Sequence, residues 1–445
     1  MIEAEREAET ARILQRVGRK EGLDLEAIEF YVRSAVLALG AAVLERLLRQ
    51  VGVGRQVSPR QCRNVHLPRK MESTGVREKV LQTILGPVRF RRSRLVCPEC
   101  GAVEYRGDEL LGVEGTSFSP GMRRLMTRAG SRESFAEAAE DLHVYGAMKV
   151  DAKDVERVAE SVGRVIDDWM RRQASAAQAG IEEPAGRQGA IPILYISLDG
   201  TGAPMRPGEL EGRKGKGPDG RARTREVKLG CVFTQTGVDE EGRPVRDPDS
   251  TSYVGAIEPS ADFGNRLYPE TVRRGLRLAE KVVVLSDGAE YNATIAREHF
   301  PGATHIVDLY HASERLSDFI KENTSHPAQS VFHQQCADLL EQGLIEDLNE
   351  RMRQALARSG PRRQNGLQRI SYFIERKEQM RYGEFRRQGL FVGSGVIEAG
   401  CKTLIGKRLK QSGMFWSVAG ANAIIAARCC IYSDRFEQFW EDTGS

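Results

Sequence analysis

Three acidic residues, each in a distinctive local sequence, are the strongest candidates for chemistry in this chain. Asp199 follows ILYISL, Asp287 follows KVVVLS, and Glu398 lies within GSGVIEAGCK. The first two runs are apolar enough to be buried strands, and α/β proteins place functional groups at the carboxyl ends of such strands. Clustered carboxylates bind Mg²⁺, and a pair of such ions stabilises the attacking and leaving oxygens in phosphodiester cleavage. We therefore expect a metal site of these three residues, although a single Asp after a strand is more often a cap or turn residue.

The surrounding elements predict a mixed α/β domain that would bring the carboxylates together. We expect strands at ILYISLD, REVKLGCVFTQT, TSYVGAIE, KVVVLSD and THIVDLYH, with a helix at DFGNRLYPETVRRGLRL. Three consecutive strands followed by alternating helix and strand give a five-stranded mixed sheet. In a ribonuclease H-like order the first and fourth strands are neighbours, so Asp199 would lie beside Asp287. A helix crossing the sheet would supply Glu398.

The chain is expected to be a multidomain α+β protein, because 445 residues are too many for one compact core. Composition and periodicity predict an N-terminal helical region at 1–55, a β-ribbon at 56–112, a helix-turn-helix region at 113–172, a linker at 173–190, the first part of the ribonuclease H-like core at 191–311, a helical insertion at 312–390, and the rest of the core at 391–445. The N-terminal helices should pack on the body or on a second copy. The two helices around Gly146 have helix-turn-helix proportions, and an ordinary helical hairpin fits the same pattern.

Two basic segments follow the candidate residues in sequence. RKGKGPDGRARTR comes after Asp199, and CKTLIGKRLKQSGMFWS comes after Glu398. The overall net charge is only +4, so any argument for nucleic acid depends on local clusters rather than on total charge. A solvated surface is the commoner explanation of such a run, but these positions are close in sequence to the carboxylates, and we expect phosphate contacts. Lys402 is four residues after Glu398 and therefore on the same helix face. Trp416 could stack on an unpaired base or be a core residue, and Phe415 is expected in the core. The candidate DNA-binding residues are Arg213, Lys214, Lys216, Arg221, Arg223, Arg225, Lys402, Lys407, Arg408, Lys410 and Trp416.

A second metal site is predicted from cysteines in the ribbon region. Cys97 and Cys100 form a CxxC knuckle, and Cys62 and His66 lie upstream where they could complete a tetrahedral Zn²⁺ site. A lone CxxC is weak evidence, and C-x3-H is an unusual first half for such a site. The eight cysteines are otherwise scattered, which indicates a reducing compartment rather than a disulfide framework. No run of 18 apolar residues predicts a membrane span, and the charged start does not resemble a signal peptide.

Several long motifs carry a resemblance to a known family. The segments ISLDGTGAPMRPGELEGRKGKGPDGRARTREVKLG, VVVLSDGAEYN, IVDLYHASERL and GSGVIEAGCKTLIGKRLKQSGMFWS resemble DDE transposases of the ISKra insertion-sequence group, related to Mutator-type enzymes. The resemblance runs from about residue 60 to the end. It implies that Asp199, Asp287 and Glu398 are the metal-binding triad and that an insertion separates the fifth strand from the Glu-bearing helix. It also implies an accessory role near the site for Asp308 and His311, although a His after a strand is more often a packing residue.

Taken together, the motifs and the resemblance predict a bacterial DNA transposase. It would bind terminal inverted repeats of double-stranded DNA, cut the ends with two Mg²⁺ or Mn²⁺ ions, and join them to target DNA. A homodimer is expected because two ends must be joined, and the location would be the cytoplasm, at the nucleoid. The alternatives are a structure-selective nuclease of the same fold, such as a junction resolvase, and a domesticated DNA-binding regulator.

Overall fold

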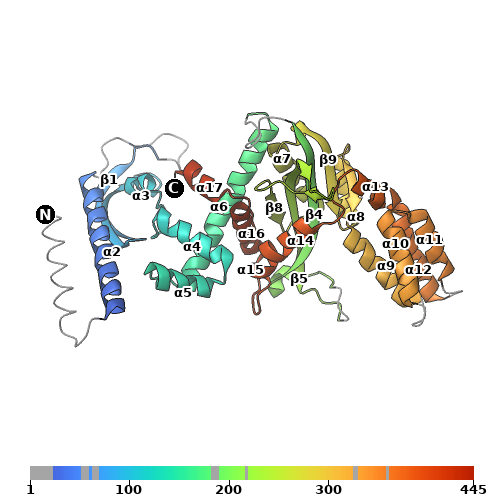
Figure 1. Ribbon diagram of the computed structural model, residues 1–445. Coiled ribbons are helices and arrows are strands. Elements are labelled where there is room, and N and C mark those ends of the chain that lie inside the picture. The colour runs from blue at the N-terminus through green and yellow to red at the C-terminus, as the bar shows by residue number, and fades with distance from the viewer. Residues whose placement is uncertain are drawn as a thin grey trace. The chain divides into compact units, whose positions relative to one another are not determined.

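The computed structural model describes residues 24–51, 60–62, 70–181, 190–215, 219–323, 329–356 and 360–444. Contacts within the chain divide it into two compact units. The first unit comprises Met1–Gly130, Phe135–Val158 and Trp440–Ser445, and the second comprises Ser131–Ser134 and Ala159–Phe439. Figure 1 shows helices and strands in both, which agrees with the predicted α/β class.

The first unit contains the predicted β-ribbon. Strands β1 (Glu72–Thr83) and β2 (Gly86–Val96) pair antiparallel around a two-residue turn, and β3 (Val103–Tyr105) pairs antiparallel with β2. Helix α3 (Arg106–Leu110) follows. Helix α2 (Leu25–Gln50) packs on the ribbon, where Glu45 accepts a hydrogen bond from the Arg89 amide at 3.0 Å and Leu48 contacts the ribbon's apolar cluster.

Helix α2 has no fully buried residue. By length and composition it is the one helix in the described ranges that could cross a membrane, which is weak evidence taken alone. The part of the N-terminal helical pair predicted before residue 24 lies outside the described residues.

The predicted helix-turn-helix elements are present as α4 (Pro120–Arg132), α5 (Phe135–Gly146) and α6 (Ala152–Gln178). The hydroxyl of Ser119 accepts from the Met122 amide at 3.2 Å and so caps α4 as expected. Two boundaries differ from the prediction. The division between the units falls inside α6, after Val158, and α6 continues six residues into the segment expected as a linker. Ala174 and Ala177 are buried, and their packing explains why this small-residue stretch is helical rather than a linker.

The second unit is built on a five-stranded mixed sheet. Its strands are β4 (Ile191–Pro204), β5 (Thr224–Gln235), β8 (Ser252–Ala256), β9 (Ala279–Ser286) and β10 (Thr304–Val307). Their order is β10-β9-β4-β5-β8, with β4, β9 and β10 parallel and β5 antiparallel to both of its neighbours. The prediction that the first and fourth core strands are neighbours is therefore confirmed. Short strands β6 (Gly237–Val238) and β7 (Pro244–Val245) form a separate hairpin.

The pleat of β4 sends its side chains to two different layers. Leu194, Ile196 and Leu198 join one apolar cluster with residues of α7 (Ser260–Arg273) and α8 (Glu290–His299). Because successive side chains alternate in a strand, Tyr195 and Asp199 point to the opposite face. That face carries α14 (Gly395–Gly400), the π-helix η5 (Cys401–Gly406), α15 (Lys407–Leu409) and α16 (Val418–Tyr432).

A group of helices separates β10 from α14, as the sequence predicts. These are α9 (Leu309–Asn323), α10 (Gln329–Gln342), α11 (Ile345–Gln354), α12 (Pro361–Glu375), η4 (Lys377–Met380) and α13 (Tyr382–Arg387), drawn in orange in Figure 1. We call this group the insertion. Its two ends are joined, because the Leu309 amide donates to the Val392 carbonyl at 3.0 Å. The remaining elements are η1 (Pro207–Leu210), η2 (Leu276–Leu278) and α17 (Phe436–Thr443).

Candidate functional site

Asp199 and Asp287 occupy equivalent positions on neighbouring parallel strands. The register of β4 with β9 ends at the pair Leu198↔Ser286, and the two Asp residues come next on each strand. Parallel strands therefore bring them to the same place at the end of β9. One detail of the prediction is corrected. Asp199 is not at the end of its strand, because β4 continues to Pro204 through its pairing with β5 alone.

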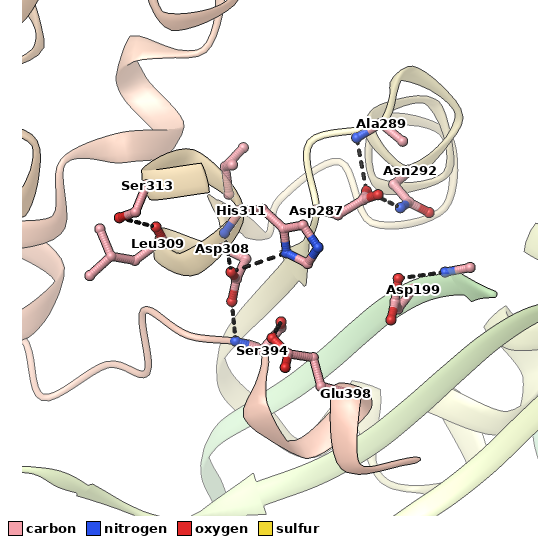
Figure 2. Close-up of polar contacts among 12 residues, drawn as sticks. Asp199, Asp287, Ala289, Asn292, Asp308, Leu309, His311, Ser313, Ser394 and Glu398 are labelled. Carbon is pink, nitrogen blue, oxygen red and sulfur yellow. Dashed lines mark hydrogen bonds and ion pairs between the residues drawn. The ribbon is translucent and has the colours of Figure 1, made fainter. Parts of the chain in front are cut away.

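The Asp287 turn is fixed by local hydrogen bonds. Oδ1 of Asp287 accepts from the Ala289 amide at 2.9 Å and from Asn292 Nδ2 at 2.8 Å, so this carboxylate also has the capping role that a strand-end Asp commonly takes. Gly288 has φ +76°, and a Cβ at this position would lie 2.3 Å from the Tyr372 hydroxyl oxygen. The turn thus requires glycine for both backbone and space. Oδ1 makes both bonds, which leaves Oδ2 of Asp287 for a ligand (Figure 2).

Glu398 reaches the site from a helix that lies very close to the sheet. A Cβ on Gly400 would lie 2.9 Å from Tyr253 Cε1 and 3.2 Å from Leu229 Cδ2, so only glycine permits this approach. Leu229 is the register partner of Asp199, which places Glu398 over the same face. The predicted sharing of a helix face with Lys402 is confirmed, because Lys402 Nζ lies 3.8 Å from Glu398 Oε2.

Asp308 is a fully buried carboxylate that joins the end of β10 to the start of the Glu398 helix. Its Oδ1 accepts from the His311 amide at 2.8 Å and lies 3.2 Å from His311 Nδ1, and its Oδ2 accepts from the Ser394 amide. The Ser394 hydroxyl in turn donates to Glu398 Oε1 at 3.2 Å. Figure 2 shows this chain of contacts with the imidazole directed toward the space between Asp287 and Glu398. Asp308 and His311 therefore lie at the site, as the sequence predicts.

The protonation of these groups follows from their surroundings. Burial alone would raise the pKa of Asp308, but hydrogen bonds from His311 and Ser394 outweigh it and lower the pKa. The hydrogen bond to Asp308, together with the charges of Asp287 and Asp199, raises the pKa of His311 to about 9. His311 is therefore a cation at neutral pH, beside a carboxylate that stays ionised.

Asp199 is in an environment that disfavours its negative charge. Burial raises its pKa and the charge of Asp287 raises it further, although hydrogen bonds from Cys401 and Gly200 oppose the rise. Within the described ranges, no Lys or Arg side chain forms an ion pair with Asp199 or Asp287. The single charge of the His311 imidazolium balances only part of the charge of these two half-buried carboxylates, so a further cation would stabilise them. The donor set therefore fits a hard divalent metal ion.

The triad is more open than a fully closed metal site. Among the described residues, one acidic group has ligand atoms that all lie within 4.8 Å of one another, and it consists of Asp308, His311 and Glu398 rather than the predicted three. Glu398 thus lies on the Asp308 side of the site, while Asp199 and Asp287 each follow the last register pair of β4 with β9.

The basic segments are partly as predicted. Residues on both sides of the loop after β4 form a hairpin, since Lys214 and Arg221 make an antiparallel bridge. The side chains that remain accessible are Arg213, Lys214, Arg221, Arg223, Lys402, Lys407 and Lys410, while Arg225 is half-buried and Lys216 lies outside the described residues. Lys410 Nζ contacts the hydroxyl of Thr201, which lies two residues beyond Asp199 on β4.

Arg408 and Trp416 correct the predicted DNA-contacting set. Arg408 is completely buried, with its guanidinium carbon 4.9 Å from the centre of the Trp416 ring. Trp416 is 5% exposed, and its indole N–H donates to the Leu409 carbonyl at 3.0 Å. Both are packing residues. Phe415 was expected in the core and is instead 61% exposed, because the backbone of Trp416 bridges to Met205 and sends the two neighbouring rings in opposite directions.

The cysteine knuckle forms a compact cluster in the first unit. The sulfur atoms of Cys62, Cys97 and Cys100 all lie within 4.8 Å of one another, with Cys62 and Cys100 3.5 Å apart. Backbone hydrogen bonds from Cys100 and Glu99 lower the pKa of the Cys97 thiol, which favours the thiolate that binds a metal. The predicted fourth ligand, His66, lies outside the described residues. The structure thus brings together the three cysteines that the sequence singles out.

The sequence analysis did not single out two residues that position the site. Ser394 lies four residues before Glu398, a spacing that could have predicted their contact on a helix. Tyr372 comes from the insertion and donates to the Asp287 carbonyl oxygen at 3.4 Å, a contact that sequence distance conceals. No protein-family model matches the sequence, and comparison with curated proteins finds no significant match.

Proposed function

We propose that this chain is a DDE-type DNA transposase of the ISKra, Mutator-like kind, with a ribonuclease H-like catalytic core. The observation that carries the proposal is the register of β4 with β9, which aligns Asp199 and Asp287 at one end of the sheet beneath the helix of Glu398. The strand order β10-β9-β4-β5-β8 is the order typical of ribonuclease H-like cores, and the insertion before Glu398 supports the same assignment.

Asp199, Asp287 and Glu398 would hold two Mg²⁺ or Mn²⁺ ions, which stabilise charge on the attacking and leaving oxygens of the scissile phosphate. In end cleavage, water attacks phosphorus and the 3′-oxygen leaves as a free hydroxyl. In strand transfer, that hydroxyl attacks a phosphorus of target DNA and displaces another 3′-oxygen. Neither step requires a covalent bond to the protein.

Other side chains have roles that follow from their places. The His311 imidazolium faces the carboxylates and balances part of their charge, held in orientation by Asp308. Lys402, beside Glu398, and Lys410, at Thr201 on β4, are exposed cations that would contact DNA phosphates. These groups orient the DNA, and such phosphate contacts carry no sequence information.

The first unit would bind the terminal inverted repeats. Its three-cysteine cluster fits Zn²⁺, with Cys62, Cys97 and Cys100 as ligands and His66 as the proposed fourth. A homodimer would hold two ends for joining, and such an enzyme would act at the bacterial nucleoid in the cytoplasm.

The proposal is tested by assaying end cleavage and strand transfer on DNA taken from the regions that flank the gene. Asp199→Asn, Asp287→Asn and Glu398→Gln should each abolish Mg²⁺-dependent products while DNA binding persists. Glu240→Gln, which changes an exposed carboxylate in the turn between β6 and β7, is the matched control and should retain activity. Cleavage of branched DNA without joining would favour a structure-selective nuclease. Product formation by the triad variants at the wild-type rate would refute the assignment.

A further inference from the structure

Helix α9 runs from the candidate site into the insertion and carries an arginine one turn after His311. Arg315 is four residues beyond His311, so the two side chains share a helix face. The guanidinium carbon of Arg315 lies 4.3 Å from the centre of the Tyr372 ring, and that of Arg376 lies 4.6 Å from the same ring. The Tyr372 hydroxyl reaches the Asp287 carbonyl. Arg315 is therefore held at a defined place beside the Asp287 turn.

Among the described residues, Arg315 has no acidic partner, in contrast to Arg369, Arg376 and Arg381 of the same insertion. Arg376 pairs with Glu290 at 3.2 Å, Arg369 with Glu322 at 2.7 Å, and Arg381 with Glu346 at 2.7 Å. Over the ranges that the structure describes, no carboxylate forms an ion pair with Arg315. Asp318, the acidic residue one turn further along α9, lies 3.7 Å from Arg369 and 4.0 Å from Lys321 instead.

The chemistry of this arrangement suits an anionic ligand. Arg315 is exposed, and its cation–π contact with Tyr372 holds the guanidinium beside the ring, where its N–H groups can donate to a ligand. A planar guanidinium held in this way suits a phosphate, which accepts two parallel hydrogen bonds. Along the axis of α9, Arg315 lies about 6 Å beyond His311, because each helical residue rises about 1.5 Å. Two successive nucleotides of one DNA strand span about 6.8 Å, so this offset is less than two nucleotides.

We propose that Arg315, stacked on Tyr372, binds a backbone phosphate of the DNA within about two nucleotides of the phosphate at the carboxylate site. The proposal rests on the proposed function, and it adds that the insertion holds the DNA strand entering the site. The contact is to the backbone, so it should not depend on base sequence.

The experiment measures the salt dependence of DNA binding. Wild-type protein, Arg315→Ala, Arg315→Lys and Arg369→Ala are titrated with a fluorescently labelled duplex of arbitrary sequence, without added Mg²⁺ or Mn²⁺ so that no strand is cut. Arg369→Ala is the matched control. It also removes one positive charge from the insertion, but that charge is paired with Glu322 and is not expected to contact DNA. Circular dichroism of each variant establishes that it is folded.

Loss of one phosphate contact should reduce the slope of log affinity against log salt by about 0.9. Raising the salt from 50 to 200 mM weakens DNA binding by each protein. The factor of weakening for Arg315→Ala should be about 3.5 times smaller than the factor for the wild-type protein. Arg315→Lys keeps the charge and should retain the slope with weaker binding, and Arg369→Ala should match the wild-type protein.

The outcomes separate this inference from the function it rests on. A slope for Arg315→Ala equal to that of the wild-type protein and of Arg369→Ala would overturn the phosphate contact, even if cleavage and joining are found. A reduced slope in a protein that binds DNA but forms no products would support the contact while removing the transposase assignment. Failure of the wild-type protein to bind DNA at all would overturn both.

Discussion

Replacing Asp308 by Asn should slow the proposed cleavage reaction although Asp308 is not one of the three predicted metal ligands. The Asp308 carboxylate accepts from His311 through one oxygen and from the buried Ser394 amide through the other. Asn offers a single acceptor oxygen. If that oxygen stays with His311, the side-chain NH₂ faces the Ser394 N–H, and two donors oppose each other.

The size of the effect can be worked from these contacts. Hydrogen bonds to a charged group contribute about 1.5–3 kcal/mol, and a buried donor left without a partner costs about 1–3 kcal/mol. We therefore expect Asp308→Asn to lower the free energy of unfolding by about 3 kcal/mol. Ser394 also holds Glu398, so the helix of Glu398 should move, and a displacement of about 1 Å can cost about 100-fold in rate.

Urea denaturation gives the stability, and single-turnover end cleavage at saturating Mg²⁺ gives the rate. Ser394→Ala is the comparison, because it removes the hydroxyl contact with Glu398 and keeps the amide bonded to Asp308. That variant should lose about 1 kcal/mol and show a smaller rate defect. If Asp308→Asn cleaves within about threefold of the wild-type rate, less than about 0.7 kcal/mol in the barrier, the positioning role is refuted even when stability falls.

Four further changes have distinct expected results. Gly400→Val should displace the Glu398 helix, because a Cβ there would lie 2.9 Å from an aromatic carbon of β8, and cleavage should fall at least about tenfold in the same assay. Cys97→Ser should lower the zinc content of purified protein measured by atomic emission, and unchanged zinc would contradict the three-cysteine site. Burial lowers the pKa of His305 to about 4, below its unfolded value of about 6.5, so the unfolded state takes up the proton first. Stability should therefore drop as pH falls from 6.5 to 4, by at most about 1.4 kcal/mol per pH unit, and His305→Gln should remove this slope in urea titrations. Trp416→Ala should cost about 3–5 kcal/mol, whereas Phe415→Ala should be nearly neutral, and equal effects of the two would contradict their opposite burial.

Much of the sheet domain was predictable because strand order follows from local patterns. Apolar runs marked β4 and β9, and the parallel pairing that aligns Asp199 with Asp287 follows from their places in the chain. The continuation of β4 beyond Asp199 was not predictable. The residues after it are glycine-rich and polar, and they remain in a strand only because β5 pairs with them across the hairpin.

The errors arose where tertiary contacts decide between neighbouring residues. Phe415 and Trp416 are adjacent aromatics, and local pattern cannot tell which ring turns inward. The bridge from Trp416 to Met205 makes that choice. Arg408 was assigned to a basic surface by its charge, yet it is buried against Trp416 and its guanidinium contacts the Met414 sulfur at 3.2 Å. The burial of Arg408 and Trp416 therefore depends on contacts formed only in the folded chain, including the bridge to Met205 about 200 residues earlier.

The hydrogen bond between Leu309 and Val392 has an engineering consequence. Since the chain leaves the sheet domain and returns to it at nearly the same point, everything between these residues is topologically one long loop. The cost of closing a loop grows only slowly with its length, so a short turn joining the two ends is compatible with the strand order of the sheet. A trimmed protein of that kind would separate the parts: the carboxylates would keep their scaffold, while Tyr372 and most of helix α9 would be gone. The length of the insertion can therefore vary between related proteins without changing the distance between Asp308 and Glu398.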